Sequence, residues 1–118
     1  MENTELHVVI TARFFTDVKC FGPGIAMLLT RVRTLHSLRA AAMDMGMAYS
    51  KAWTILKEAE RGLGFKLLHS TTGGRGGGGA TLTEEGERFL AAYEAYTRDL
   101  KACGQDLFQQ YFSEFIQP

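Results

Sequence analysis

The sequence predicts a mainly α-helical fold with a small amount of β-structure, and three observations lead to this prediction. Apolar residues recur at helical spacing in three short segments between residues 23 and 61. A glycine-rich loop at 71–79 separates two short segments that read as strands. A long helical pattern then fills the last third of the chain. The predicted order is two strands, three short helices, a hairpin and a long helix.

The composition is that of one ordinary globular domain. The chain has 118 residues, 46% of them hydrophobic, and its 13 basic and 13 acidic residues give a formal net charge of zero. A chain of this length buries roughly two-thirds of its surface on folding, which is enough for one core. The sequence contains no run of 18 apolar residues, so it predicts no membrane span, and its N-terminus lacks the basic region of a signal peptide. We therefore expect a cytoplasmic protein without a membrane partner.

Cysteines and histidines give no sign of catalytic or metal chemistry. Cys20 and Cys103 have neither metal-ligand spacing nor the pattern of a disulfide framework, so we expect reduced thiols and no metal site. His7, His36 and His69 are scattered, with no paired carboxylate or nucleophile motif beside them. The chain is therefore not expected to be an enzyme or to hold a cofactor.

The zero net charge hides an uneven distribution. Residues 31–75 contain eight basic and three acidic residues, whereas residues 84–118 contain three basic and seven acidic ones. A basic middle beside an acidic tail is typical of a phosphate-facing surface backed by a segment that does not touch nucleic acid. Ordinary surface scatter is the alternative that charge alone leaves open.

The N-terminal part predicts a strand pair followed by a helix. Leu6–Phe15 is rich in β-branched and aromatic residues and predicts a strand, and residues 18–21 predict a shorter second one, so residues 5–21 form an N-terminal strand pair. The sequence Gly-Pro-Gly at 22–24 ends this pair and begins a helix. Apolar residues at helical spacing carry that helix to about Leu35.

Two more helices follow. Ser37 is a good N-cap for a short helix through Asp44, and Gly46 breaks the chain after it. A third helix runs from about Ala48 to Arg61, and glycines at positions 62 and 64 are expected to end it.

Residues 37–61 fit a helix-turn-helix, in which two short helices cross at a steep angle and approach closely. The first helix must carry small side chains where the second passes over it, and Ala41 and Ala42 supply them. Met45 and Met47 flank the turn as apolar anchors, and Gly46 tolerates positive φ. Each position that a helix-turn-helix requires to be small or apolar thus carries a residue of that kind.

The third helix divides into an apolar and a polar face. At about 100° per residue, Ala52, Ile55, Leu56, Ala59 and Leu63 fall on one side. Hydroxyl and cationic side chains on the other side suit phosphate oxygens and base edges in the major groove, and two aromatic residues flank them. A solvated helix face, with the tryptophan half-buried in the core, is the open alternative. The predicted DNA-binding residues on this helix are Tyr49, Ser50, Lys51, Trp53, Thr54, Lys57 and Arg61.

Residues 65–83 predict a two-stranded wing. Phe65–Ser70 and residues 80–82 read as its strands, with the glycine loop between them. A phosphate loop of the nucleotide-binding type is excluded, because such a loop leads into a helix and this one leads into a strand. Arg75 at the tip is predicted to contact a phosphate or enter the minor groove. Residues 1–83 are thus expected to form a winged helix-turn-helix domain that binds DNA.

Residues 84–118 predict a dimerisation helix that Thr83 caps and that runs to about Phe112. Its apolar residues, spaced by three or four, form a stripe too long for a domain of this size to cover, so we expect a homodimer. The alternative is a helix that folds back at Gly104 onto its own domain. The predicted dimerisation residues are Phe89, Tyr93, Tyr96, Leu100 and Leu107.

Three runs of residues carry a resemblance to a known family. The runs GPGIAMLL at 22–29, AYSKAW at 48–53 and TGGRGGGGATLT at 72–83 resemble the N-terminal domain of the ModE family. These are molybdenum-dependent transcriptional regulators whose winged helix-turn-helix is similar to that of LysR-type regulators. The resemblance, which covers residues 22–96, implies a dimer whose recognition helix begins at Tyr49, whose wing is the glycine loop and whose linking helix is the tail.

The sequence departs from the family in two ways. Ala48 and Ser50 stand where members usually carry serine and a basic residue, so the helix cap and one phosphate contact are expected to shift to Ser50 and Lys51. Full-length members also carry C-terminal molybdate-binding domains, whereas this sequence ends at Pro118. It therefore resembles the stand-alone members, and no molybdate sensing by these residues is expected.

The leading function is a sequence-specific DNA-binding regulator linked to molybdate or metal-oxyanion metabolism. A homodimer would place two third helices in successive major grooves of a near-palindromic operator, ~34 Å apart. The effector and any sensor partner are open. One alternative is a protein-interaction module that has lost DNA binding. Another is an oxyanion sensor that holds anions at the wing glycines or at residues 22–24.

Overall fold

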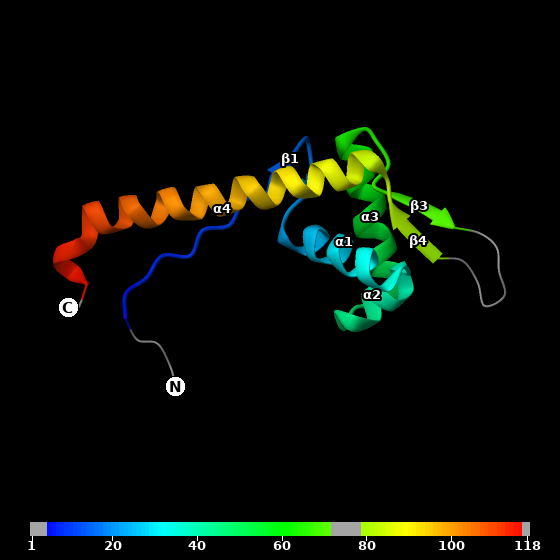
Figure 1. Cartoon of the computed structure of the whole chain (residues 1–118), viewed down its shortest axis with the longest axis horizontal. Helices are drawn as coiled ribbons and strands as arrows, with labels where there is room; N and C mark the ends of the chain where they lie inside the picture. Colours follow the sequence, from blue (N-terminus) through cyan, green and yellow to red (C-terminus); the bar gives the residue numbers. More distant parts are fainter. Residues whose placement is uncertain (1–4, 72–78, 117–118) are drawn as a thin grey trace.

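The computed structural model of the chain describes residues 5–71 and 79–116. Figure 1 shows the first three helices gathered in one body, from which a fourth helix projects to one side and a hairpin to the other. Both strand pairs are antiparallel. The predicted class, a winged helix-turn-helix with an N-terminal strand pair and a long C-terminal helix, is confirmed. In chain order the elements are β1 (Phe14–Phe15), β2 (Lys19–Phe21), α1 (Pro23–Leu35), α2 (Leu38–Asp44), α3 (Tyr49–Leu63), β3 (Leu68–Thr71), β4 (Gly79–Leu82), α4 (Glu84–Phe112) and the short 3-10 helix η1 (Ser113–Phe115).

The N-terminal strand is much shorter than predicted. Only Phe14 and Phe15 pair with β2, and no strand among the described residues pairs with residues 5–13, which we call the N-terminal arm. The arm runs beside α4 (Figure 1), where the Tyr93 hydroxyl donates a hydrogen bond to the carbonyl oxygen of Ala12 at 2.8 Å. The prediction of a strand over residues 6–13 was wrong because a β-forming sequence makes a strand only where another strand meets its backbone.

The helix-turn-helix forms where the sequence predicts it. The Ser37 hydroxyl accepts a hydrogen bond from the Ala40 amide at 3.0 Å and so caps α2. Gly46, in the turn to α3, has a φ of 68°, in the left-handed region that glycine tolerates best. Ala41 and Ala42 are fully buried where α3 crosses α2. The small residues thus allow the close helix crossing that the prediction required.

Helix α3 is longer than predicted, because Gly62 does not end it. Gly62 lies inside the helix, and a Cβ atom there would come within 2.5 Å of Cys20 Cβ on β2. This glycine allows α3 and β2 to pack closely. Gly64, with a φ of 86°, is the residue that ends α3.

The core lies between the helices and the base of the hairpin. Its largest fully buried side chains are Phe21, Leu28, Leu29, Val32, Leu67 and Leu90. β3 begins at Leu68 instead of the predicted Phe65, because the amide of Leu67 is taken by the Glu60 carboxylate and its carbonyl by the Thr83 amide. From Leu68 onward, β3 pairs in regular antiparallel register with β4.

Helix α4 extends far beyond this core. Thr83 caps it by accepting a hydrogen bond from the Gly86 amide at 2.8 Å, and the helix continues unbroken through Gly104, which excludes a fold-back there. The molecule measures 61 × 34 × 22 Å, and its radius of gyration of 17.8 Å exceeds the ~13.5 Å of a compact domain of this length. The buried residues of α4 end at Tyr93, so most of the helix has no core beneath it.

Candidate nucleic-acid interface

Helix α3 presents a polar face to solvent. Ala52, Leu56 and Ala59 are buried, as predicted, and hold the helix against the core. Ser50 and Thr54 lie exposed on the opposite side, so the hydroxyls are free to reach a ligand. Its N-cap is Ala48, which offers no side-chain acceptor, so the expected shift of the cap to Ser50 does not occur.

Two aromatic side chains of α3 each support a cation. The guanidinium carbon of Arg39, on α2, lies 4.2 Å from the centre of the Tyr49 ring. The Lys57 Nζ atom lies 5.3 Å from the centre of the Trp53 ring. Trp53 is 47% exposed, so it belongs to the surface and not to the core. Cation–π contacts of this kind hold long side chains in one place at the cost of little solvation.

Glu60 connects α3 to the hairpin. Its Oε2 atom accepts hydrogen bonds from the amides of Leu67 and Leu68, at 2.7 and 3.2 Å, and its Oε1 atom lies 3.4 Å from Lys57 Nζ. The Glu60 side chain is only 9% exposed. Its carboxylate therefore ties α3 to the base of the hairpin and lies beside the Lys57 ammonium group.

A polar groove lies between α3 and the hairpin. Its volume is about 320 Å³. It is lined on the helical side by Arg39, Tyr49, Trp53 and Lys57, and on the hairpin side by residues that include Ser70. We call it the α3–hairpin groove. The predicted site residues Tyr49, Trp53 and Lys57 thus come together around one concave surface.

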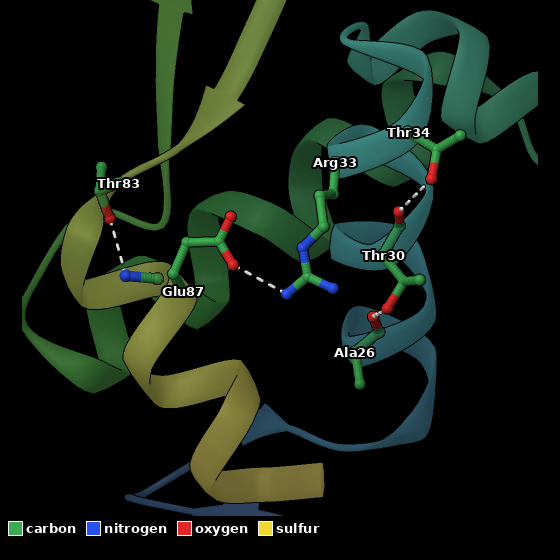
Figure 2. Close-up of polar contacts among 7 residues, drawn as sticks. Ala26, Thr30, Arg33, Thr34, Thr83 and Glu87 are labelled. Atoms are coloured by element: carbon green, nitrogen blue, oxygen red, sulfur yellow. Dashed lines mark hydrogen bonds and ion pairs between the residues drawn. The ribbon is translucent and has the colours of Figure 1, made fainter.

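The basic segment carries less free charge than its composition suggests, because two of its arginines form ion pairs. Arg31 pairs with Asp44 at 2.7 Å, and Arg33 pairs with Glu87 at 2.8 Å. Figure 2 shows the second pair, which joins α1 to the start of α4.

Other cations of the segment remain available. Within residues 5–71 and 79–116, no acidic side chain pairs with Arg39, Lys51, Arg61 or Lys66. Three of these four cations, Arg39, Lys51 and Arg61, belong to the helix-turn-helix. The free positive charge is thus concentrated there.

Arg75, the predicted wing contact, lies outside the described residues. The sequence analysis also missed two residues, Arg39 and Glu60. Arg39 lies over Tyr49, which belongs to a different helix, and only the tertiary crossing brings them together, so no spacing in the sequence reveals the pair. In the sequence, Glu60 is one of several charged residues on α3, and only the structure shows that its carboxylate accepts a hydrogen bond from the hairpin backbone.

The predicted dimerisation stripe divides into a covered and an uncovered part. Phe89 and Tyr93 pack against Phe14 and Phe21 in an aromatic cluster, with ring centres 4.7–6.1 Å apart. Burial raises the pKa of the Tyr93 hydroxyl above its usual value, and the nearby positive charge of Arg13 opposes this shift. These contacts place Phe89 and Tyr93 against the chain's own core, and their role in a dimer stays a prediction.

The remaining stripe residues are less covered, although the Tyr96 ring centre also lies 5.9 Å from that of Phe14. Tyr96 is 51% exposed and Leu107 47% exposed, and Leu100 is half-buried. In the part of the chain that the structure describes, no helix is both long and apolar enough to cross a membrane. Residues 5–71 and 79–116 also contain no group of three or more His, Cys, Asp or Glu side chains that could hold a metal ion.

Three helices that include a helix-turn-helix, followed by a hairpin, define the winged helix-turn-helix class. The family model of bacterial regulatory helix-turn-helix proteins of the lysR family matches residues 26–87. Because this match covers more than half of the chain, the protein belongs to that family.

Several relatives share the same region. The DNA-binding transcriptional dual regulator ModE of Escherichia coli K12 is 36% identical over 72 residues, which are 61% of this chain and 28% of the relative. The molybdenum-pterin-binding protein MopB of Rhodobacter capsulatus is 37% identical over 68 residues, 58% of this chain and 25% of the relative. The transcriptional regulator ModE of Haemophilus influenzae is 32% identical over 100 residues, 83% of this chain and 37% of the relative.

The matches therefore span only 25% to 37% of the length of these relatives. The resemblance to the ModE family that the sequence predicts is confirmed over the helix-turn-helix region.

Proposed function

We propose that the protein is a DNA-binding transcriptional regulator that acts as a homodimer. The observation that carries the proposal is the exposed face of α3, the second helix of a helix-turn-helix, where hydroxyls stand beside cations that have no acidic partner among the described residues. Lys51 and Arg61 would contact backbone phosphates, and Ser50 and Thr54 base edges in the major groove. Arg75, on the loop of the wing, would contact a phosphate or the minor groove.

The regulated process in this proposal is molybdate or metal-oxyanion metabolism. Its support is the similarity to proteins named ModE and to a molybdenum-pterin-binding protein. The proposal concerns the regulated process alone and assigns no oxyanion site to these residues.

The proposed dimer forms along α4. Residues 1–83 would bind DNA and residues 84–118 would pair with their copy, although the first turns of α4 also belong to the core of the DNA-binding part. Most of the stability of a helix in a protein comes from packing of its apolar face, and the exposed Tyr96 and Leu107 favour a partner for this one. Two paired copies would place two α3 helices on one near-palindromic operator.

The test is fluorescence anisotropy with a labelled random-sequence duplex of 24 base pairs at 50 and 200 mM salt. We expect binding that weakens steeply with salt. Lys51→Gln should weaken binding to every sequence and flatten the plot of log K against log salt by about 0.9 for each phosphate that the variant leaves unneutralised. Arg98→Gln removes a positive charge from α4 and serves as the matched control. An absence of binding at 50 mM salt would refute the proposal and favour a protein-interaction module.

A further inference from the structure

Arg39 is the cation of the helix-turn-helix that sequence reasoning did not assign. It is exposed, it stands near the start of α2, and no acidic side chain of the described residues pairs with it. One side of its guanidinium faces the Tyr49 ring, with the guanidinium carbon 4.2 Å from the ring centre. The stacking holds the charge at the rim of the α3–hairpin groove.

Lys57 is held at the same groove by a different arrangement. Its ammonium group is 5.3 Å from the Trp53 ring centre and 3.4 Å from Glu60 Oε1. The other oxygen of Glu60 accepts hydrogen bonds from the amides of Leu67 and Leu68, so this carboxylate is shared between Lys57 and the hairpin backbone. Two cations on separate helices are thus fixed around one polar cavity.

The chemistry of the groove suits a phosphate group. A guanidinium offers paired N–H donors that match two phosphate oxygens, and an ammonium adds a point charge. Ser70 adds a hydroxyl from the hairpin side. A volume of about 320 Å³ accommodates a phosphate, whereas an apolar ligand would find few apolar walls there.

We propose that the α3–hairpin groove binds one phosphodiester of the DNA backbone, held by Arg39 and Lys57. This inference rests on the proposed function. If α3 enters the major groove and the hairpin lies on the neighbouring backbone, one strand passes over the groove between them. Arg39 then fixes the register of the protein on the duplex without reading a base.

The first test is the salt dependence of Arg39→Gln, measured by anisotropy with the same random-sequence duplex. Each phosphate that is no longer neutralised lowers the salt slope by about 0.9, so the affinity ratio between 50 and 200 mM salt should shrink by about 3.5-fold for each chain bound. Arg39→Lys keeps the charge and should keep the slope, with weaker binding at both salt concentrations. Arg98→Gln, which removes a charge from α4, should behave as the wild type.

The second test uses Trp53, the single tryptophan of the chain, as a reporter within the groove. Duplex DNA should change its emission in the wild type and in Arg98→Gln, and less in Arg39→Gln. Inorganic phosphate at millimolar concentration should leave the emission unchanged, since a free anion lacks the rest of the duplex contacts. A response to inorganic phosphate that equals the response to DNA would assign the groove to a free anion and overturn the inference.

The outcomes separate the two proposals. A wild type that does not bind DNA overturns the proposed function and this inference together. A wild type that binds with a steep salt slope, while Arg39→Gln keeps that slope, supports the function and refutes the groove. Circular dichroism of each variant at the assay temperature confirms that it is folded, and the exposed position of Arg39 makes unfolding an unexpected result.

Discussion

Gly86 lies in the first turns of α4, where the helix passes directly over the carbonyl group of Leu67. A Cβ atom added there would lie 2.5 Å from the Leu67 carbonyl oxygen and 3.1 Å from Thr83 Oγ1. Both are atoms that cannot easily move, because one is backbone and the other caps the helix. We expect Gly86→Ala to lower the free energy of unfolding by about 1–3 kcal/mol, measured by urea denaturation.

Gly104→Ala on the same helix is the matched control. The added methyl group would meet the end of the Ile10 side chain, which can rotate away. Alanine also favours the helix over glycine by about 1 kcal/mol. The control should therefore be neutral or slightly stabilising. If both variants were destabilised equally, the close contact between Gly86 and Leu67 would not be the cause.

Single residues were predictable from the sequence where their role is local. Ser37 and Thr83 cap helices through a bond three residues along the chain, so a propensity argument finds them. Gly62 was predicted to end α3 and instead allows close packing against Cys20, which is 42 residues away in the sequence. Arg39 is of the same kind, since its stacking partner Tyr49 lies on another helix.

At the scale of elements, the junction of α3 and the hairpin depends on one buried carboxylate. Replacing Glu60 with alanine would leave the amides of Leu67 and Leu68 without an acceptor, and each buried unpaired amide costs about 1–3 kcal/mol. We expect Glu60→Ala to lower the free energy of unfolding by at least that amount. Urea denaturation followed by Trp53 emission measures it.

Glu60→Gln is the conservative variant, because its amide oxygen can still accept one or both bonds. Its loss of stability should be less than half that of Glu60→Ala. Equal losses in the two variants would mean that the negative charge, and not the hydrogen bonding, holds the hairpin to α3.

The elements differ in how well the sequence predicts them. Helices α1 and α2 and the end of α4 at Phe112 follow from spacing and capping, which are local. The N-terminal arm fails because its sequence favours a strand, while pairing depends on a distant partner. In the structure the arm is held instead by the hydrogen bond from the Tyr93 hydroxyl to the carbonyl oxygen of Ala12, a residue of the arm that is 81 positions away in the sequence.

At the scale of the whole molecule, the projecting half of α4 (Figure 1) carries the interface of the proposed dimer. At about 100° per residue, Tyr96, Leu100, Cys103, Leu107 and Tyr111 fall within ~80° of one another on the helix surface. This stripe continues the face that Phe89 and Tyr93 turn towards the core. Cys103 lies at its middle, so symmetric pairing over the whole stripe, parallel or antiparallel, brings the two copies of Cys103 together.

The dimer is therefore testable by cross-linking. Cys103 is exposed and Cys20 is buried, so a short bismaleimide should join two chains through Cys103 alone. We expect a product of twice the chain mass in the wild type and none in Cys103→Ser.

Leu107→Glu would place a charge in the stripe and should raise the dimer dissociation constant at least tenfold, which corresponds to about 1.4 kcal/mol. Gln109→Glu adds the same charge on the opposite face and should leave the dimer intact. A monomer mass by sedimentation at micromolar concentration, with no cross-linked product, would refute α4 pairing, and a dimer that Leu107→Glu leaves unchanged would place the interface elsewhere.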